Sequence, residues 1–173
     1  MARVFISVGS NIDPEKNVLR ALTMLASKAR ILAVSTFYLT EPHGGVGQPS
    51  FHNGVVEIET GLLPIELKHS VLRAIEDRMG RVRTDDKCVP RAIDLDVLVY
   101  DDLVMEAEDL AIPDPQISDR AFLAVPLCEL APDLILPGTS LSMEEIAARF
   151  EGHAMQPLRE YTERLRDDLL ITQ

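Results

Sequence analysis

The sequence predicts an α+β fold in a single domain. Segments with the period of β-strands alternate with segments of helical period, two strand patterns follow each other directly, and the composition is that of a globular protein. A length of 173 residues is enough for one substantial core. We predict one domain over 1–173, with the functional motifs within 3–137 and a helical C-terminal extension over 141–173.

The first part of the chain predicts the order strand, helix, strand, strand. Residues 3–8 place apolar side chains alternately on one face, as a strand does. Asp13 and Pro14 predict a helix start, with Asp13 as the capping carboxylate and Pro14 in the first helical position. The apolar stripe of this helix is formed by Val18, Leu22, Leu25, Ala26 and Ala29. Residues 31–40 and 53–60 predict two further strands.

The next segment predicts a second helix and a fourth strand. Pro64 opens the helix and Gly80 ends it. The stripe of this helix is formed by Leu67, Val71, Ile75 and Met79. Residues 92–100 then read as a strand. The order βαββαβ predicts a ferredoxin-like core, in which a mainly antiparallel sheet carries helices on one face.

The remaining chain predicts shorter elements around this core. Residues 110–115 (LAIPDP) suggest an edge strand that is stopped by its prolines, and 119–129 suggest a helix. Ser142 and Glu145 form a capping-box pattern at the start of another helix. Residues 157–173 can form an amphipathic helix, which could pack on the body or pair two subunits.

Composition limits the classes of partner. A net charge of −11 argues against a nucleic-acid partner, because phosphate binding requires a basic face. The sequence has no apolar stretch of the ~20 residues that a membrane span needs and shows no leader segment. Cys88 and Cys128 match no metal-binding spacing, so we expect a reducing, cytoplasmic location.

The stretch PRAIDLDVLVY at 90–100 places two carboxylates in an apolar strand. Side chains alternate across a strand, so Asp94 and Asp96 are expected on one face, ~6–7 Å apart at Cα. The residues expected on the opposite face are Ile93, Leu95, Val97 and Val99. Two carboxylates on one face can bind Mg²⁺, whose other ligands are phosphate oxygens and water. On this pattern alone, a solvent-exposed polar face is an equal alternative.

The loop before this strand is rich in cations. The segment GRVRTDDKCVPR contributes Arg81, Arg83, Lys87 and Arg91 to an otherwise acidic protein. Guanidinium groups suit phosphate oxygens, and cations facing a carboxylate-bound Mg²⁺ are typical of phosphoryl transfer. A solvated charged loop is the alternative. The sequence contains neither a GxxxxGK[ST] loop nor a GxGxxG motif.

A second group of residues could hold a flat ring. Tyr38 and Thr40 share a face of one predicted strand, and Phe51 and Asn53 share a face near the start of the next. Phe51 and Phe122 could stack on a heterocycle while Asn53 reads its amide edge. Alternatively, both phenylalanines belong to the core and Asn53 is a turn residue.

Several blocks match one known family. These blocks are SVGSN at 7–11, FYLTEP at 37–42, QPSFHN at 48–53, GRVR at 80–83, PRAIDLDVL at 90–98 and RAFLAVPLCELAP at 120–132. Together, and in this order, they resemble the 6-hydroxymethyl-7,8-dihydropterin pyrophosphokinase family. The resemblance implies transfer of pyrophosphate from ATP to the hydroxymethyl group of a reduced pterin in folate biosynthesis. It also implies two Mg²⁺ ions and a ferredoxin-like fold.

The resemblance assigns roles by position. Asp94 and Asp96 would hold the metal ions and, together with Arg81 and Arg91, form the catalytic set. The implied pterin-binding residues are Thr40, Pro42, Phe51, Asn53 and Phe122. The implied ATP-binding residues are Glu76, Arg81, Arg83, Lys87, Arg91, Ile112, Asp114 and Arg120. The family's mobile loops correspond to 43–50 and 82–90.

The sequence departs from the family pattern on the ATP side. Cys88 and Val89 stand where tryptophan and glycine are usual, Asp114 replaces a histidine, and Thr84 replaces a basic residue. Two hypotheses follow: an active enzyme with an altered ATP site, or a non-catalytic or repurposed paralogue that binds a pterin-like ligand or a partner protein. We expect ATP and a reduced pterin as partners, no nucleic acid or membrane, and a monomer or weak homodimer.

Overall fold

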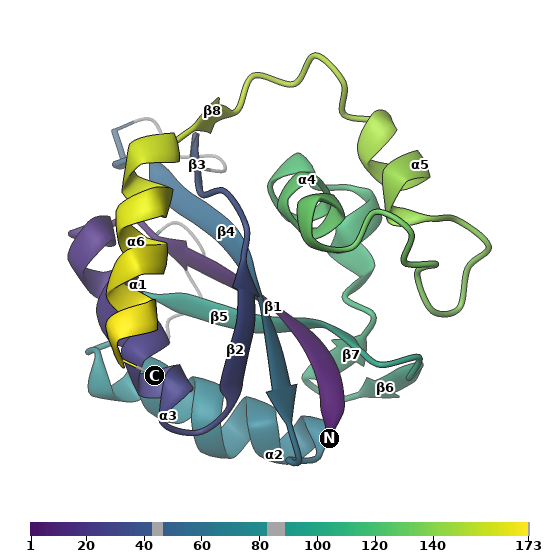
Figure 1. Cartoon of the computed structure of the whole chain (residues 1–173), viewed down its shortest axis with the longest axis horizontal. Coiled ribbons are helices and arrows are strands. Elements are labelled where there is room, and N and C mark those ends of the chain that lie inside the picture. Colours follow the sequence, from purple (N-terminus) through teal and green to yellow (C-terminus); the bar gives the residue numbers. More distant parts are fainter. Residues whose placement is uncertain (43–46, 83–88, 173) are drawn as a thin grey trace.

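A six-stranded antiparallel sheet lies at the centre of the part of the chain that the computed structural model describes, residues 1–42, 47–82 and 89–172 (Figure 1). Its strands are β1 (Ala2–Ser10), β2 (Arg30–Val34), β3 (Tyr38–Thr40), β4 (Phe51–Thr60), β5 (Asp94–Tyr100) and β8 (Gln156–Pro157). The order is β5-β1-β4-β3-β8, with β2 paired to β4 beside β3. This confirms the predicted antiparallel sheet and places β5 at its edge.

The predicted strand at 31–40 is divided into β2 and β3. Ser35 interrupts the ladder: its backbone N–H donates to the Val55 carbonyl and its hydroxyl accepts from the Val55 N–H, each at 2.9 Å. Phe37 follows and is fully buried. A Cβ on Gly54 would come within 2.7 Å of the Phe37 ring, so only glycine allows this approach. The break therefore keeps the backbone bonded while it turns an aromatic ring into the core.

One face of the sheet is covered by the helices that the βαββαβ pattern predicts. These are α1 (Pro14–Ala26) and a continuous helical segment made of α2 (Pro64–Glu66), η1 (Leu67–Leu72) and α3 (Arg73–Arg78). The stripes predicted for both helices contribute to one core beneath β1 and β4. The start at Pro64 and the end before Gly80, which has a φ of 81°, are confirmed. The sequence did not predict that η1 is a π-helix.

The predicted cap of α1 is wrong in its mechanism. Pro14 does occupy the first helical position. Asp13, however, has a left-handed backbone with φ 38°, and its carboxylate makes no capping hydrogen bond. A capping side chain requires the extended backbone that Asp13 lacks. The Asp13 carbonyl instead accepts from the Asn17 N–H at 2.9 Å.

The other face of the sheet has its own core. Phe5, Val55 and Leu98 point to this face and are buried under α4 (Ala121–Leu130), α5 (Met143–Ala148) and the short helix η2 (Pro115–Ser118). Figure 1 shows α4 and α5 away from α1. Glu129 ties α4 to the sheet, because its carboxylate accepts from the Thr36 N–H at 2.8 Å and from the Tyr38 hydroxyl. The sequence predicted α4 and α5, but neither η2 nor the packing of these helices on this face.

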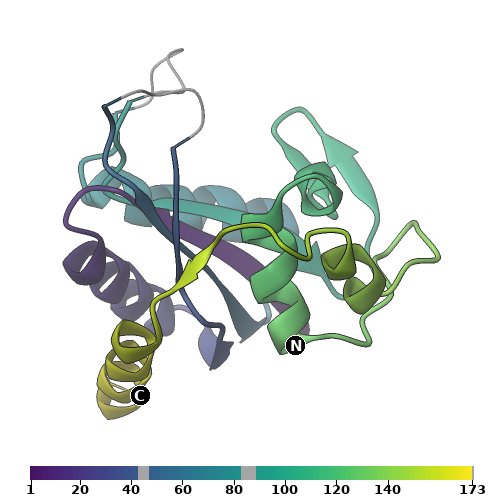
Figure 2. The ribbon, with the colours of Figure 1, turned by 90° about the horizontal axis from the view of Figure 1, so that it is seen from above.

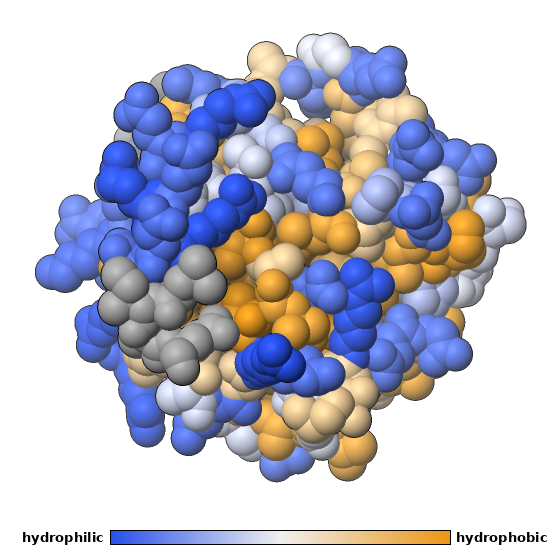
Figure 3. All heavy atoms as spheres, in the orientation of Figure 1, coloured by the Kyte–Doolittle hydropathy of each residue, from blue (hydrophilic) through white to orange (hydrophobic). Residues whose placement is uncertain are grey.

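Apolar surface remains visible over the middle of the sheet, between the side that carries α6 and the side that carries α4 (Figure 3). Polar residues surround it. Leu32 on β2 is a large apolar residue that stays exposed, with 44% of its surface accessible. The second core thus covers the sheet only in part.

The edge strand predicted at 110–115 belongs to a different sheet. β7 (Leu110–Ile112) pairs with β6 (Met105–Ala107) in a small antiparallel sheet of two strands. The outer edge of β5 is already covered, since the Leu95 N–H donates to Glu76 and the Leu98 carbonyl accepts from the Asp114 N–H at 2.8 Å. Backbone N–H and C=O groups that are already hydrogen-bonded cannot pair with a further strand at this edge.

The C-terminal part packs on the body. The predicted capping box is confirmed at α5, where Ser142 and Glu145 bond reciprocally. The last helix, α6 (Arg159–Thr172), lies beside α1 in Figures 1 and 2 and buries Tyr161, Leu165 and Leu169 in the first core. Of the two sequence-based alternatives, the structure therefore shows packing on the body. Among the described helices, none is long and apolar enough to cross a membrane.

Candidate active site

The two aspartates of β5 lie on one face, as the sequence predicts. Asp94 and Asp96 are partly exposed, and the opposite face of the strand is buried in the first core through Ile93, Leu95 and Val97. The prediction for Val99 is wrong. A bulge separates the pairs Ile6–Val97 and Phe5–Val99, so the alternation shifts and Val99 joins the second core.

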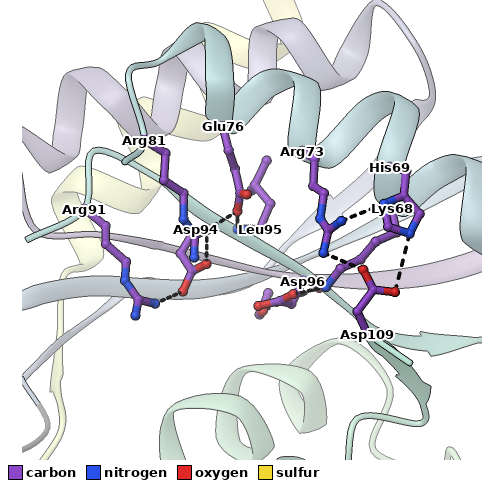
Figure 4. Close-up of polar contacts among 11 residues, drawn as sticks. Lys68, His69, Arg73, Glu76, Arg81, Arg91, Asp94, Leu95, Asp96 and Asp109 are labelled. Atoms are coloured by element: carbon purple, nitrogen blue, oxygen red, sulfur yellow. Dashed lines mark hydrogen bonds and ion pairs between the residues drawn. The ribbon is translucent and has the colours of Figure 1, made fainter. Parts of the chain in front are cut away.

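Two arginines hold Asp94, and a buried glutamate holds one of these arginines (Figure 4). Arg91 Nη1 donates to Asp94 Oδ2 at 2.6 Å, and Arg81 donates to Oδ1 of the same carboxylate. Arg81 also pairs with Glu76, whose Oε1 accepts from the Leu95 N–H at 2.9 Å. Burial raises the pKa of Glu76, while the Leu95 N–H and Arg81 oppose that rise. Glu76 therefore fixes Arg81 against the strand edge.

Asp96 has a different partner, which the sequence analysis missed. Lys68 Nζ, from η1, lies 2.6 Å from Asp96 Oδ1. Burial and the charge of Asp94 raise the pKa of Asp96, and Lys68 offsets part of this effect. A lysine on a predicted helix carries no signal that it reaches a strand far along the chain, so sequence reasoning had no means to find it.

Asn11 and Ser10 position the segment that carries Arg91. The Arg91 N–H donates to Asn11 Oδ1 at 2.7 Å, and the Asn11 N–H donates to the Arg91 carbonyl at 3.1 Å. Asn11 Nδ2 also donates to the Pro49 carbonyl at 3.3 Å, and Ser10 Oγ donates to the Ala92 carbonyl at 2.6 Å. Both side chains are buried. In the structure, Asn11 joins the chain at Pro49 to the chain at Arg91.

Asp114 faces the same charged cluster from beyond the edge of β5. Its Oδ1 accepts from the Gln116 N–H at 2.8 Å at the start of η2. Burial raises the pKa of Asp114, the Gln116 bond opposes this, and the charge of Asp96 adds to it. The Ile112 side chain lies in the first core, and Arg120 directly precedes α4.

The predicted pterin-binding residues of β3 and β4 lie together. Asn53 Nδ2 donates to Thr40 Oγ1 at 2.6 Å, and Thr40 pairs with Phe51 in the ladder. A Cβ on Gly9, the partner of Asn53 on β1, would lie 2.5 Å from Asn53 Oδ1. Asn53 is thus a strand residue, and the turn alternative is wrong. Gly9 is a second residue that sequence reasoning missed.

The aromatic residues differ in placement. Phe51 is half-buried and belongs to neither core, whereas Phe122 on α4 packs partly against the second core. Pro42 is half-buried at the end of the described segment. The predictions for Arg83, Thr84, Lys87 and Cys88 lie outside the described residues, as do parts of the loops 43–50 and 82–90.

The donor set fits Mg²⁺. Asp94 and Asp96 offer only carboxylate oxygens from one face of one strand, and their side chains are 25% and 40% exposed. Mg²⁺ commonly takes one or two carboxylates and completes its shell with substrate phosphates and water. In the structure these oxygens form ion pairs with Arg81, Arg91 and Lys68. The same three cations could also bind phosphate oxygens. The described residues thus place carboxylates and cations together at β5, and the neutral polar side chains of Asn53 and Thr40 together on β3 and β4.

Comparison with known proteins identifies the family. The family model described as 7,8-dihydro-6-hydroxymethylpterin-pyrophosphokinase (HPPK) matches residues 5–132. A 2-amino-4-hydroxy-6-hydroxymethyldihydropteridine pyrophosphokinase of Pseudomonas aeruginosa is 39% identical over 154 residues, which cover 87% of this chain and 94% of that protein. The Haemophilus influenzae protein of the same name is 35% identical over 90% of this chain and 97% of its own length. The chain therefore belongs to the HPPK family.

Two longer proteins extend the comparison. Folic acid synthesis protein fol1 of Schizosaccharomyces pombe is 44% identical over 82% of this chain, which spans only 19% of that protein. A crystal structure of Plasmodium falciparum HPPK-DHPS superimposes with a TM-score of 0.70 at 14% identity, covering 86% of this chain and 43% of that one. The second likeness supports the fold.

Proposed function

We propose that this chain transfers pyrophosphate from ATP to the hydroxymethyl group of 6-hydroxymethyl-7,8-dihydropterin, giving AMP and the pterin diphosphate, in folate biosynthesis. One observation carries the proposal beyond family membership: Asp94, bound by Arg81 and Arg91, shares its strand face with Asp96. Such a cluster supplies both the carboxylates for a metal and the cations for phosphates. The alternative of a repurposed paralogue has no support from these observations.

The products define which bonds change. The pterin hydroxyl oxygen attacks the β-phosphorus of ATP, the bond from that phosphorus to the oxygen retained by AMP breaks, and the hydroxyl proton is released. Mg²⁺, held by Asp94 and Asp96 and expected as two ions, supplies charge neutralisation on the phosphate oxygens when bound. Arg81 and Arg91 exchange their carboxylate partners for phosphate oxygens, where negative charge develops. Asn11 keeps Arg91 in place during this exchange.

The pterin binds beside β3 and β4. Asn53 is oriented by its bond to Thr40 and by the space over Gly9, so that its amide meets the polar edge of the pterin. Phe51 and Phe122 stack on the ring faces, with Pro42 at the rim. The ATP side uses Glu76, Arg81, Arg83, Lys87, Arg91, Ile112, Asp114 and Arg120.

We infer further that the core has the ferredoxin-like topology and that the chain is one domain. The strand order β5-β1-β4 followed by β2 and β3, with α1 and α3 between strands, supports this topology. The internal burial of the α6 stripe supports a monomer or a weak homodimer. The net charge of −11 supports small-molecule partners without nucleic acid, and a cytoplasmic location fits a folate enzyme.

The test is direct product detection. The protein is incubated with ATP, Mg²⁺ and 6-hydroxymethyl-7,8-dihydropterin, and AMP and pterin diphosphate are quantified by chromatography. We expect both products in equal amounts, and none when Mg²⁺ is removed by a chelator. Folded protein that binds the pterin and forms no AMP would instead support the repurposed paralogue.

A further inference from the structure

Lys68 is placed as a specific partner of Asp96. Its ammonium lies 2.6 Å from Asp96 Oδ1, and its side chain is only 14% exposed while that of Asp96 is 40% exposed. The carboxylate therefore opens to solvent on one side and meets Lys68 on the other. Figure 4 shows Lys68 reaching from η1 toward β5.

The π-helix explains how Lys68 reaches this position. Lys68 and Glu76 both contact β5, and they are eight residues apart. In a regular α-helix, residues at this spacing point about 80° apart. A turn closed by i→i+5 bonds contains one more residue than an α-turn, which reduces the effective spacing to about seven and brings both side chains to one face. Lys68 is the second residue of η1, which supplies such turns before the chain reaches Glu76 in α3.

Each of the two carboxylates on β5 has cationic partners of its own. Asp94 has Arg81 and Arg91, whereas Asp96 has Lys68. The neighbouring cation on the same helix, Arg73, has a carboxylate of its own in Asp109, at 2.5 Å. Lys68 therefore occupies one of the two oxygens of Asp96 and places a positive charge beside the expected metal position.

We propose that Lys68 is an internal counterion of the metal site, which weakens binding of a bare divalent cation at Asp96 and exchanges to phosphate when the metal arrives with ATP. This rests on the proposed function, because it requires the metal at Asp94 and Asp96. A bare cation meets only repulsion from Lys68, whereas a metal–ATP complex brings phosphate oxygens that the ammonium can pair with. The metal therefore binds to the site together with the nucleotide.

Manganese binding tests this proposal without catalysis. Mn²⁺ prefers oxygen ligands as Mg²⁺ does, and in the nucleotide-free protein the signal of the free ion reports binding by electron paramagnetic resonance. With ATP, which itself chelates Mn²⁺, equilibrium dialysis of Mn·ATP against the protein reports binding instead. The nucleotide-free protein is titrated as wild type and as Lys68→Met, Lys68→Gln, Lys28→Met and Arg73→Met. Lys28 is an exposed lysine in the turn between α1 and β2, and Arg73 is the cation of the same helical segment that pairs with Asp109. Urea unfolding establishes that each variant is folded.

We expect both Lys68 variants to bind Mn²⁺ about tenfold more tightly than wild type, and both controls to stay within about twofold. With ATP present, the Lys68 variants should show no such gain, because they lose the ammonium–phosphate contact. Unchanged Mn²⁺ affinity in both Lys68 variants, an equal gain in Arg73→Met, or the same gain with ATP would overturn the proposal.

One further variant separates this proposal from the metal assignment. Asp96→Asn should lose Mn²⁺ binding both with and without ATP. If it does so while the Lys68 variants match wild type, only the role of Lys68 is refuted. If Asp96→Asn binds Mn²⁺ as wild type does, the metal assignment fails and the role of Lys68 fails with it.

Discussion

The charged side and the neutral side of the candidate site are built in different ways. On β5, Asp94 and Asp96 are held by ion pairs to Arg81, Arg91 and Lys68. On β3 and β4, Asn53 is fixed by the strand register, one side-chain hydrogen bond and the missing Cβ of Gly9. Under the proposed function, the charged side exchanges partners when its ligand binds, whereas the side chains of the neutral side are already in place.

The difference also matches the departures that the family resemblance implies. By that resemblance, Asp114, Cys88 and Val89 stand in place of the usual residues on the proposed ATP side, while Thr40 and Asn53 keep the family pattern on the proposed pterin side. Ion pairs between long side chains tolerate replacement because other charges can compensate. A position fixed by backbone register has no such freedom. The following predictions test this contrast.

Asp96→Asn should have the largest effect. We expect AMP formation to fall by at least about 100-fold, because a metal ligand and its charge are lost together. The unfolding free energy should change by less than about 1 kcal/mol, since the variant relieves repulsion from Asp94 and loses the pair with Lys68. Asp109→Asn is the control, because Asp109 pairs with Arg73 outside the site. Full activity of Asp96→Asn at saturating Mg²⁺ would refute the metal role.

Phe122→Ala should weaken pterin binding much more than ATP binding. Loss of one stacking ring costs about 1–3 kcal/mol, from lost burial and ring contact. Calorimetric titration with each ligand separately measures both affinities. Phe150→Ala is the matched control, since Phe150 also packs partly against the second core. Equal losses for the two ligands would mean that Phe122 is only a core residue.

Gly9→Ala tests whether the neutral side is fixed by the backbone. The new Cβ would lie 2.5 Å from Asn53 Oδ1, so the amide must move. We expect pterin affinity to fall by about tenfold and unfolding free energy to drop by about 1–3 kcal/mol, with ATP affinity unchanged. Gly61→Ala is the control, because its Cβ would meet only the Met1 sulfur at 3.5 Å. A variant with wild-type pterin affinity would show that Asn53 does not need this position.

Asp114→His should tighten Mg·ATP binding by about fivefold, and Asp114→Asn should give part of that gain. Asp114 adds negative charge beside Asp96, where ATP phosphates are expected. Affinities of the three proteins at two salt concentrations decide the cause, since a Coulombic effect shrinks as salt rises. Weaker binding by both variants would make Asp114 a working ligand instead.

His52 should give the smallest effect, on the pH dependence of stability. Burial lowers the pKa of His52, which lies against Tyr161 with ring centroids 5.3 Å apart. As the pH falls, the His52 imidazole becomes protonated in the unfolded chain before it does so in the folded chain. The unfolding free energy should therefore fall as the pH drops from 7 toward 5. Urea unfolding across this range should show a shallower decline for His52→Gln. Parallel curves for the two proteins would exclude His52 as the source.

Sequence patterns predicted most of the elements, because strand and helix periods and the proline and glycine signals depend on local residues. The misses have non-local causes. Val99 changed face because a bulge in β5 depends on pairing with β1. Lys68 reached Asp96 through a π-helix that sequence spacing does not reveal. Asp13 failed as a cap because its backbone is left-handed, which its residue type did not indicate.

The same division holds for the site. The carboxylates and arginines were predictable because they cluster within a short stretch of the chain. The roles of Gly9, Asn11 and Lys68 required knowledge of which strand or loop lies opposite each of them. The residue type of a glycine, an asparagine or a lysine does not indicate its role until its neighbours in the fold are known.

A crystal structure of the complex with Mg²⁺, a non-hydrolysable ATP analogue and the pterin tests the contrast most directly. We predict that the 2.6 Å contacts of Arg91 with Asp94 and of Lys68 with Asp96 are broken, and that Arg81, Arg91 and Lys68 all contact phosphate oxygens. The 2.6 Å bond between Asn53 and Thr40 should remain unchanged. A complex in which the β5 ion pairs persist while Asn53 has turned away from Thr40 would contradict this account.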